Sequence, residues 1–410
     1  MSATNLHPSL AKRMASAKPS PTAAVSDEAR RLRAEGHKII NLGEGELDFD
    51  TPESIRAAGI AAINGGDTKY TAVAGTASLK KAVAEKFKRE NGLSYSPAEL
   101  IVSCGAKQII YNAFQATVEE GDEVIVPAPY WVSYPDMVAL AGGKPVIVSC
   151  GHEDGFKLTP AALEEAITPA TKWLILNSPS NPTGALYSKE ELAGLAEVLC
   201  RHPQILVLSD DIYEHIVYEG SFISFATAAP DLLGRTLTVN GVSKCFSMTG
   251  WRVGYAGGPD WLIRALEILQ SQSTSNASSI SQAAAEVALN GDTAFLGEWT
   301  NLLRERRDIV LDAISRTNGL LTAEAPSSAF YVYASCAGAI GLHTADGVQI
   351  NSDVDMAKYL LTAAGSAVIP GVAFGLSPFL RIAYAINTDE LRTACEAMVT
   401  ACRALQKDAA

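Results

Sequence analysis

The sequence predicts an α/β fold in which a largely parallel sheet is wrapped by helices. Strand-like and helix-like patterns alternate from residue 51 to about residue 290, and this rhythm is typical of parallel sheets whose connections are helices. Polar residues also follow directly after several apolar strand-like runs. Because open α/β sheets bind ligands at the carboxyl ends of their strands, these positions are candidates for a site.

The elements follow one another in a readable order. In the first part of the chain we expect helices at 77–90 and 108–118 and strands at 101–103 and 123–126. Further strand-like runs stand at 173–176, 205–208 and 253–257. After residue 293 the pattern changes to a long charged helix at 299–316, two strand-like runs at 329–334 and 379–383, and a final helix at 388–405. This change predicts a second structural unit in the C-terminal part.

Composition narrows the class of protein. The chain has 410 residues, enough for two domains, and 48% hydrophobic residues, enough for large cores. A net charge of -12 argues against nucleic acid or an anionic membrane as the main partner, and no apolar run approaches the ~18 residues of a membrane helix. The seven cysteines are scattered and form no Cys-x-x-Cys pair, so we expect no metal site, no disulfide framework and a cytoplasmic location.

Lys244 is the most informative single residue. It follows a strand-like run and precedes Arg252 by eight positions, and Arg252 leads into the strand-like run at 253–257. A lysine that forms a Schiff base needs desolvation, because only its neutral amine is nucleophilic. Taken alone, the stretch also fits an ordinary surface lysine.

Three other strand-like runs end in chemically useful residues. One ends in Ser-Asp-Asp-Ile-Tyr at 209–213, one in an Asn-Pro-Thr-Gly motif at 181–184, and one in Cys-Gly-Ala-Lys at 104–107. Each has a plain structural interpretation as well: Asp210 as a helix N-cap, Tyr213 as a core residue, and 181–184 as a turn. It is their occurrence together, at strand ends, that favours a site.

Together with Ala-Pro-Tyr-Trp-Val-Ser-Tyr-Pro at 128–135 and Phe-Leu-Arg at 379–381, these motifs resemble the class I aminotransferases, pyridoxal phosphate enzymes of fold type I. The resemblance is closest to the bacterial aspartate and aspartate/prephenate branch and runs from about residue 18 to the C-terminal helix. It implies a large domain at 48–292 with a mostly parallel seven-stranded sheet. It also implies a smaller α+β domain formed by 1–47 and 293–410.

The resemblance assigns roles around the cofactor ring. Lys244 would hold pyridoxal phosphate as a Schiff base and then move the proton of the substrate α-carbon. Asp210 would keep the pyridine nitrogen protonated, and each unit of pKa it adds there is worth ~1.4 kcal/mol. Asn181 and Tyr213 would donate to the phenolic oxygen, and Trp131 would stack on the ring. Alternatively, Trp131 is an ordinary residue of the hydrophobic core.

The phosphate site would lie at a helix N-terminus. Gly105 and Ala106 lack bulk, so backbone N–H groups can face an anion there, with Lys107 beside them and Arg252 as a bidentate clamp. Tyr70 matches a family tyrosine that reaches the phosphate of the neighbouring subunit. The resemblance therefore implies a homodimer with shared active sites.

Substrate binding would use a separate set of residues. Arg381, otherwise readable as a surface cation, would clamp the α-carboxylate with help from Asn181, and Gly45 would line the pocket. No arginine occurs at 269–276, where many aspartate aminotransferases place the one that binds the distal carboxylate. We therefore expect Lys107, assisted by Thr22, to bind that carboxylate.

The sequence favours a transaminase that moves an amino group from aspartate, or a related amino acid, to 2-oxoglutarate. Alternatives are an aromatic or prephenate aminotransferase, a pyridoxal phosphate-dependent β-lyase or synthase, and, with least support, a non-enzymatic regulator. In each enzymatic case the partners would be small amino and keto acids. Three departures from the family pattern stand out: Leu47 in place of a proline, Asp211 in place of a glutamate, and a serine in the segment 327–331 where a glycine is common.

Overall fold

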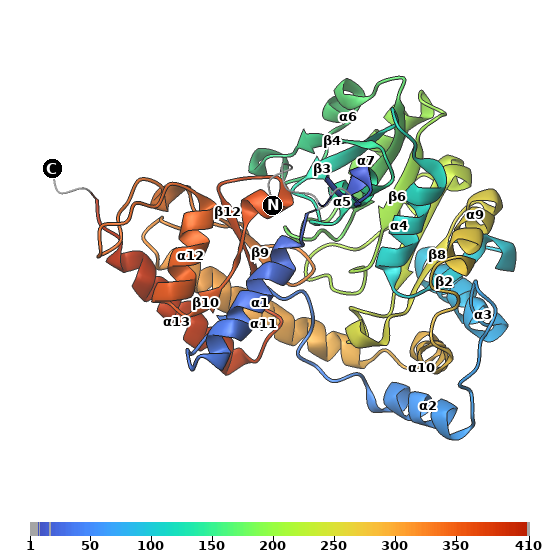
Figure 1. The fold of residues 1–410 in the computed structure, drawn as a ribbon, viewed down its shortest axis with the longest axis horizontal. Helices are drawn as coiled ribbons and strands as arrows, with labels where there is room; N and C mark the ends of the chain where they lie inside the picture. The colour runs from blue at the N-terminus through green and yellow to red at the C-terminus, as the bar shows by residue number, and fades with distance from the viewer. Residues whose placement is uncertain (1–6, 8, 16–17, 408–410) are drawn as a thin grey trace.

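A seven-stranded sheet lies at the centre of the larger part of the molecule in the computed structural model (Figure 1). The structure describes residues 7, 9–15 and 18–407. In spatial order the strands are β2 (Leu100–Ser103), β8 (Gly254–Gly257), β7 (Thr236–Gly241), β6 (Leu206–Asp210), β5 (Thr171–Asn177), β3 (Glu123–Ala128) and β4 (Lys144–Ser149). β8 runs antiparallel to both of its neighbours, and the other pairs are parallel. The predicted seven-stranded, mostly parallel sheet is thus confirmed.

Helices cover the sheet, and its central strands are therefore buried along most of their length. Every residue of β7 is buried, as are most residues of β5 and β6, so these strands are near-continuous apolar runs, as expected of a parallel sheet. The helices of this part are α2 (Glu53–Asn64), α3 (Ala77–Lys86), α4 (Ala106–Thr117), α5 (Tyr134–Leu140), α6 (Pro160–Ala166), α7 (Lys189–Cys200), α8 (Phe225–Ala228), α9 (Asp260–Ser271) and α10 (Ser279–Asn290).

Local chemistry sets several helix boundaries. Ser188 and Glu191 form a capping box at the start of α7. The helix expected at 77–90 is shorter: α3 ends at Lys86, and the chain continues as a π-helical segment, η3 (Phe87–Asn91), that stops at Gly92 in the left-handed conformation. The strand expected from residue 329 begins at Tyr331 instead, because Ala329 has a φ of +57°, which extended strands exclude.

A second, smaller set of elements lies beside the sheet. It contains a three-stranded antiparallel sheet, β11 (Ile369–Pro370), β12 (Phe379–Ala383) and β9 (Tyr331–Ser335), and a short parallel pair, β1 (Ile40–Asn41) with β10 (Ser366–Ala367). Its helices are α1 (Pro21–Ala34), α11 (Phe295–Ser315), α12 (Asp353–Ala363) and α13 (Thr388–Ala404). In Figure 1 the blue α1 lies next to these orange and red elements.

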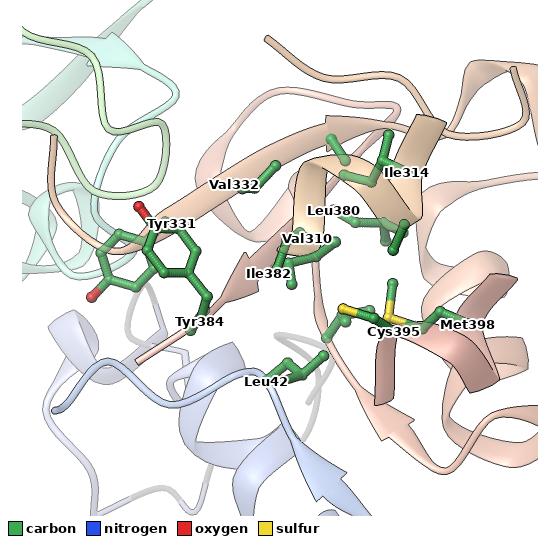
Figure 2. Close-up of a cluster of buried hydrophobic side chains, with 14 of the residues drawn as sticks. Leu42, Val310, Ile314, Tyr331, Val332, Leu380, Ile382, Tyr384, Cys395 and Met398 are labelled. Carbon is green, nitrogen blue, oxygen red and sulfur yellow. The ribbon is translucent and has the colours of Figure 1, made fainter. Parts of the chain in front are cut away.

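The core of this second set joins both ends of the chain. Figure 2 shows Leu42 from the N-terminal region packed with Val310 of α11, Ile382 of β12 and Met398 of α13. Such packing is what a small domain built from 1–47 and 293–410 requires, although the domain boundaries themselves stay a prediction. Parts of those ranges, at 1–6, 8, 16–17 and 408–410, lie outside the described residues.

Among the helices that the structure describes, none combines the length and the apolar character needed to cross a lipid bilayer.

Candidate active site

The carboxyl ends of the parallel strands open into a cleft of about 570 Å³. β5 and β6 are in register so that Asn177 pairs with Asp210, the last residue of each strand. The opposite wall of the cleft comes from α1, residues 43–46, β9 and β12. The lining includes the predicted residues Thr22, Gly45, Ala106, Lys107, Trp131, Asn181, Asp210, Tyr213, Lys244, Arg252 and Arg381.

Lys244 lies on the loop that follows β7, with its ammonium inside the cleft. Its Nζ donates to the carbonyl oxygen of Gly45 and stands 5.8 Å from the centre of the Tyr213 ring. Burial lowers the pKa of Lys244 to about 8, against the attraction of the Glu46 carboxylate, and the charge of Arg381 lowers it further. The neutral, nucleophilic amine is therefore about a tenth of the population at pH 7, far more than for an ordinary lysine.

Asp210 is 5% exposed and ends β6. The Tyr134 hydroxyl donates to its Oδ2 at 2.6 Å, and the backbone N–H of Ile212 donates to Oδ1 at 3.4 Å. Burial raises the pKa of Asp210 to about 6, although both hydrogen bonds and the charge of Lys244 oppose the rise. A cationic N–H group in the cleft would favour the ionised form further, so this carboxylate is suited to a protonated ring nitrogen.

Arg381 is 2% exposed, so the interpretation as a surface cation is wrong. Its Nη1 donates to Asn181 Oδ1 at 3.0 Å and its Nη2 to the carbonyl oxygen of Gly43 at 2.5 Å, while Nε has no hydrogen-bond partner. The guanidinium also lies over the Tyr331 ring, 4.6 Å from its centre. Burial lowers the pKa of Arg381, but an arginine stays charged. A buried cation with an unpaired N–H is a strong binding site for a carboxylate.

The opposite end of the cleft is built to hold an anion. α4 begins at Ala106 with no side chain capping it, so its first N–H groups and its dipole face the cleft. Gly105 has a φ of +89°, and a Cβ there would lie 2.5 Å from Arg252 Nη2, so only glycine lets the guanidinium approach the helix end. Lys107 Nζ is 3.3 Å from Ser133 Oγ and 4.7 Å from the centre of the Trp131 ring.

Arg252 differs in detail from the expectation. Its two terminal nitrogens donate to the carbonyl oxygens of Thr249, at 3.0 Å, and Cys104, at 3.3 Å, and its side chain reaches the cleft with the rest of its N–H groups. Burial, with the nearby charge of Arg252, lowers the pKa of Lys107. Two cations and a helix N-terminus thus converge on one volume, which favours a dianion such as a phosphate group.

Tyr70 lies away from the other predicted site residues. It does not line the cleft and is 89% exposed, so within one chain it has no part in the site.

Several residues of the site were missed by sequence reasoning. Tyr134 holds Asp210, Tyr331 shares a 2.8 Å hydrogen bond with the Tyr213 hydroxyl, and Asn177 Nδ2 donates to the Asp210 carbonyl oxygen at 2.9 Å. Tyr134 lies within the 128–135 motif and Asn177 at a strand end, so both had a local signal. Tyr331 had none, because its partner is 118 residues away.

Comparisons with known proteins agree with this geometry. The sequence profile of "Aminotransferase class I and II" matches residues 37–398. The chain is 54% identical, over 97% of its length and 99% of the relative, to the aspartate/prephenate aminotransferase of Cereibacter sphaeroides. It is 51% identical to the aspartate aminotransferase of Rhizobium meliloti, with 96% of each chain covered.

Solved structures show the same similarity. The crystal structure of the aspartate aminotransferase from Rhizobium meliloti superposes with a TM-score of 0.94 at 51% identity, covering 98% of this chain and all of that one (100%). The aspartate aminotransferase from Thermus thermophilus with maleate gives a TM-score of 0.90 at 43% identity, covering 96% and 100%.

Proposed function

Because the chain belongs to the class I and II aminotransferase family, we propose that it transfers the amino group of aspartate to 2-oxoglutarate with the help of pyridoxal phosphate. One observation carries the proposal. The amine of Lys244 shares one cleft with an anion site at the start of α4 and with two buried groups, Asp210 and Arg381. We choose aspartate as the amino donor because the relatives named above are aspartate aminotransferases.

The residues of the cleft fit pyridoxal phosphate at both of its ends. The uncapped first turn of α4, with Arg252 and Lys107, would hold the phosphate. Asp210 would accept a hydrogen bond from the protonated ring nitrogen, a role that suits a buried carboxylate already held by the Tyr134 hydroxyl. Trp131 lines the cleft between these ends and would cover the ring and exclude water.

When bound, pyridoxal phosphate withdraws electrons from the substrate α-carbon, so that its proton can be removed. Lys244 would take that proton and return it at a different carbon, because its lowered pKa lets it act as base and acid near neutral pH. Arg381 and Asn181 would hold the α-carboxylate and so orient the bond to be broken. Tyr213, kept in place by Tyr331, would donate a hydrogen bond into the site.

The distal carboxylate of aspartate would be bound by Lys107 together with Thr22. Both line the cleft, from α4 and α1 respectively, and a charge-assisted hydrogen bond there contributes about 1.5–3 kcal/mol. The Thermus thermophilus relative whose structure contains maleate, a dicarboxylate, supports a site for two carboxylates.

The active unit would be a homodimer in which Tyr70 completes the site of the neighbouring subunit. An 89% exposed tyrosine on the single chain supports this arrangement, since a partner would cover it. Measuring mass in solution, together with activity of equal mixtures of Tyr70→Phe and Lys244→Ala chains, tests the sharing. Mixed dimers that regain no activity beyond either parent would contradict it.

A panel of amino donors with 2-oxoglutarate, read out by the keto acids formed, tests the proposed function. We expect the highest kcat/KM for aspartate, and formation of glutamate in equal amount to oxaloacetate. Release of ammonia or pyruvate without glutamate would instead identify a β-lyase.

A second candidate function is amino transfer to prephenate, which the aspartate/prephenate name of the Cereibacter sphaeroides relative favours. The same assay with prephenate in place of 2-oxoglutarate decides it, since aspartate must then be consumed at a comparable rate.

A further inference from the structure

Behind the cleft lies a cluster of buried polar side chains that the proposed reaction does not use. We call it the Glu214 cluster; it consists of Lys86, Glu90, Asn91, Glu214, His215 and Asn240. Lys86 is 1% exposed and Glu214 is 6% exposed. A buried charge is expensive unless it is fully paired, so a cluster of this kind needs an explanation.

Glu214 is the centre of the cluster. One oxygen, Oε1, accepts hydrogen bonds from Lys86 Nζ and from Asn240 Nδ2, the latter at 2.7 Å. The other, Oε2, accepts from Asn91 Nδ2 at 2.7 Å, and Asn91 Oδ1 in turn accepts from Lys86 Nζ at 2.8 Å. Burial alone would raise the pKa of Glu214, but these donors and the nearby charges hold it below its usual value, so the carboxylate is ionised.

Two further charges face the pair. Glu90 lies 3.5 Å from Lys86 Nζ, and its Oε2 is 2.9 Å from His215 Nε2. The Lys86 ammonium supplies positive charge among these carboxylates, so the cluster is explained without a metal ion.

The partners of Glu214 come from three different segments. Glu214 follows Tyr213 directly, on a turn after β6 that has no regular backbone pattern. Asn240 belongs to β7, and the chain leaves that strand at Gly241 to reach Lys244 three residues later. Lys86 and Asn91 bracket η3, where α3 widens into a π-helical turn, and such turns occur often at functional sites.

Tyr213 and Lys244 therefore lie on two neighbouring loops, one after β6 and one after β7. The backbone hydrogen bonds between β6 and β7 end before either residue is reached. The separation of Tyr213 and Lys244, 5.8 Å from Nζ to the ring centre, depends on how those loops are held. The Glu214–Asn240 hydrogen bond ties the loop that carries Tyr213 to the end of β7, four residues before Lys244. The Lys86–Glu214 ion pair ties the loop that carries Tyr213 to α3.

We propose that Glu214 is a positioning residue that fixes Tyr213 relative to Lys244. The proposal rests on the proposed function, since it concerns the same site. A carboxylate held by three hydrogen bonds has a single favourable position, whereas the loop that carries it has several when it is unpaired. Misplacement of a reacting group by about 1 Å costs roughly 100-fold in rate, so the cluster acts on turnover rather than on substrate affinity.

Glu214→Gln in the cofactor-loaded enzyme tests the proposal. We expect kcat to fall about 10- to 100-fold while KM for the amino donor stays within about threefold, the signature of an interaction that matters in the transition state. The midpoint of the pH titration of the cofactor absorbance band should also shift, by about half a unit or more, because that midpoint depends on the surroundings of Lys244. Wild-type kcat with an unshifted midpoint would overturn the proposal.

A double variant separates positioning from stability. Lys86→Met with Glu214→Leu removes both buried charges, and such replacements often restore stability. We expect Tm to recover toward the wild-type value while kcat and the absorbance midpoint stay altered. If kcat and midpoint recover together with Tm, the cluster serves stability alone and the proposal is wrong.

Asn240→Ala decides the matter if the Glu214 variants do not fold. It leaves the ion pair intact and removes the hydrogen bond to Glu214, together with the one that Asn240 Oδ1 accepts from the Gly241 N–H at 2.7 Å. We expect kcat to fall about tenfold; unchanged kcat and midpoint would overturn the proposal. Lys172→Met is the matched control. It breaks a partly buried 2.8 Å ion pair with Asp122 at the other end of the sheet and should change neither quantity.

Failure of the proposed function would look different. Wild-type protein would then show no amino transfer with any donor, while the absorbance midpoint and the dissociation constant for pyridoxal phosphate would still report on the position of Lys244.

Discussion

The two walls of the cleft are built in different ways. At the sheet edge, Asp210 and Asn181 are buried and hydrogen-bonded to residues from other elements, such as Tyr134. On α1, Thr22 is partly exposed and Arg30 is mostly exposed, with Arg30 Nη1 3.8 Å from Glu44 Oε1. The sheet edge is therefore rigid before any ligand binds, whereas the α1 part of the opposite wall is held by exposed contacts that water and salt weaken.

The difference indicates that catalysis and substrate selection depend on different parts of the cleft. Groups that must match a transition state need fixed positions, which buried hydrogen bonds supply. Groups that select a substrate contribute one or two charge-assisted bonds each. We therefore expect large effects of substitutions at the sheet edge and smaller ones toward α1.

The largest effect should come from Lys244→Ala. Loss of the amine removes both the attachment point of the cofactor and the base, so we expect kcat to fall by at least about 10⁴-fold. Steady-state turnover of aspartate and the absorbance of bound cofactor measure it. Lys244→Arg should be no better, because a guanidinium stays protonated at neutral pH; substantial activity in either variant would place the base elsewhere.

Asp210→Asn should come next. The amide cannot hold a proton on the ring nitrogen, so kcat should fall about 10³-fold, since each unit of pKa lost there corresponds to roughly tenfold. Cofactor should still bind, because the anion site at Ala106 and Arg252 is untouched. Asp211→Asn is the control and should be far milder, as Asp211 does not line the cleft. Equal losses in the two variants would refute the division of roles.

The lowered pKa of Lys244 makes a pH prediction for the sheet edge. With a pKa of about 8, the neutral amine is a minor species at pH 6 and the major one at pH 9. Because only the neutral amine reacts, the rate at which cofactor-free protein captures pyridoxal phosphate should rise roughly 100-fold across that range and level off above pH 8. Stopped-flow absorbance measures it, and a rise centred near pH 10.5 would show that the surroundings do not perturb this lysine.

Lys107→Ala tests whether Lys107 binds the distal carboxylate of the substrate or the phosphate of the cofactor. If Lys107 binds the distal carboxylate, kcat/KM for aspartate and glutamate should fall about 10- to 150-fold, while any activity with phenylalanine or tyrosine changes much less. Equal losses for acidic and aromatic donors would assign Lys107 to the phosphate instead.

The smallest effect should come from Arg30→Ala on α1. Its ion pairs with Asp27 and Glu44 are solvent-exposed, and such pairs contribute about 0–1 kcal/mol, so kcat/KM for aspartate should change less than about fivefold. A larger loss would show that α1 closes onto the substrate and becomes part of the rigid wall.

The sequence alone determined the order of the elements and the kinds of chemistry at the strand ends. Lys244, Asp210, Asn181 and Arg381 could be predicted because each stands beside a short apolar run or within a recognisable motif. Such signals depend only on neighbours along the chain, where period and turn chemistry act.

Only the tertiary structure decided which of these groups touch and how they are held. The hydrogen bond of Tyr213 with Tyr331 joins residues 118 positions apart, and the ion pair of Lys86 with Glu214 spans 128. The end of α3 at Lys86, four residues before the expected position, belongs to the same arrangement. These features arise when separately formed elements pack and must pair their buried polar groups, and no local pattern records that requirement.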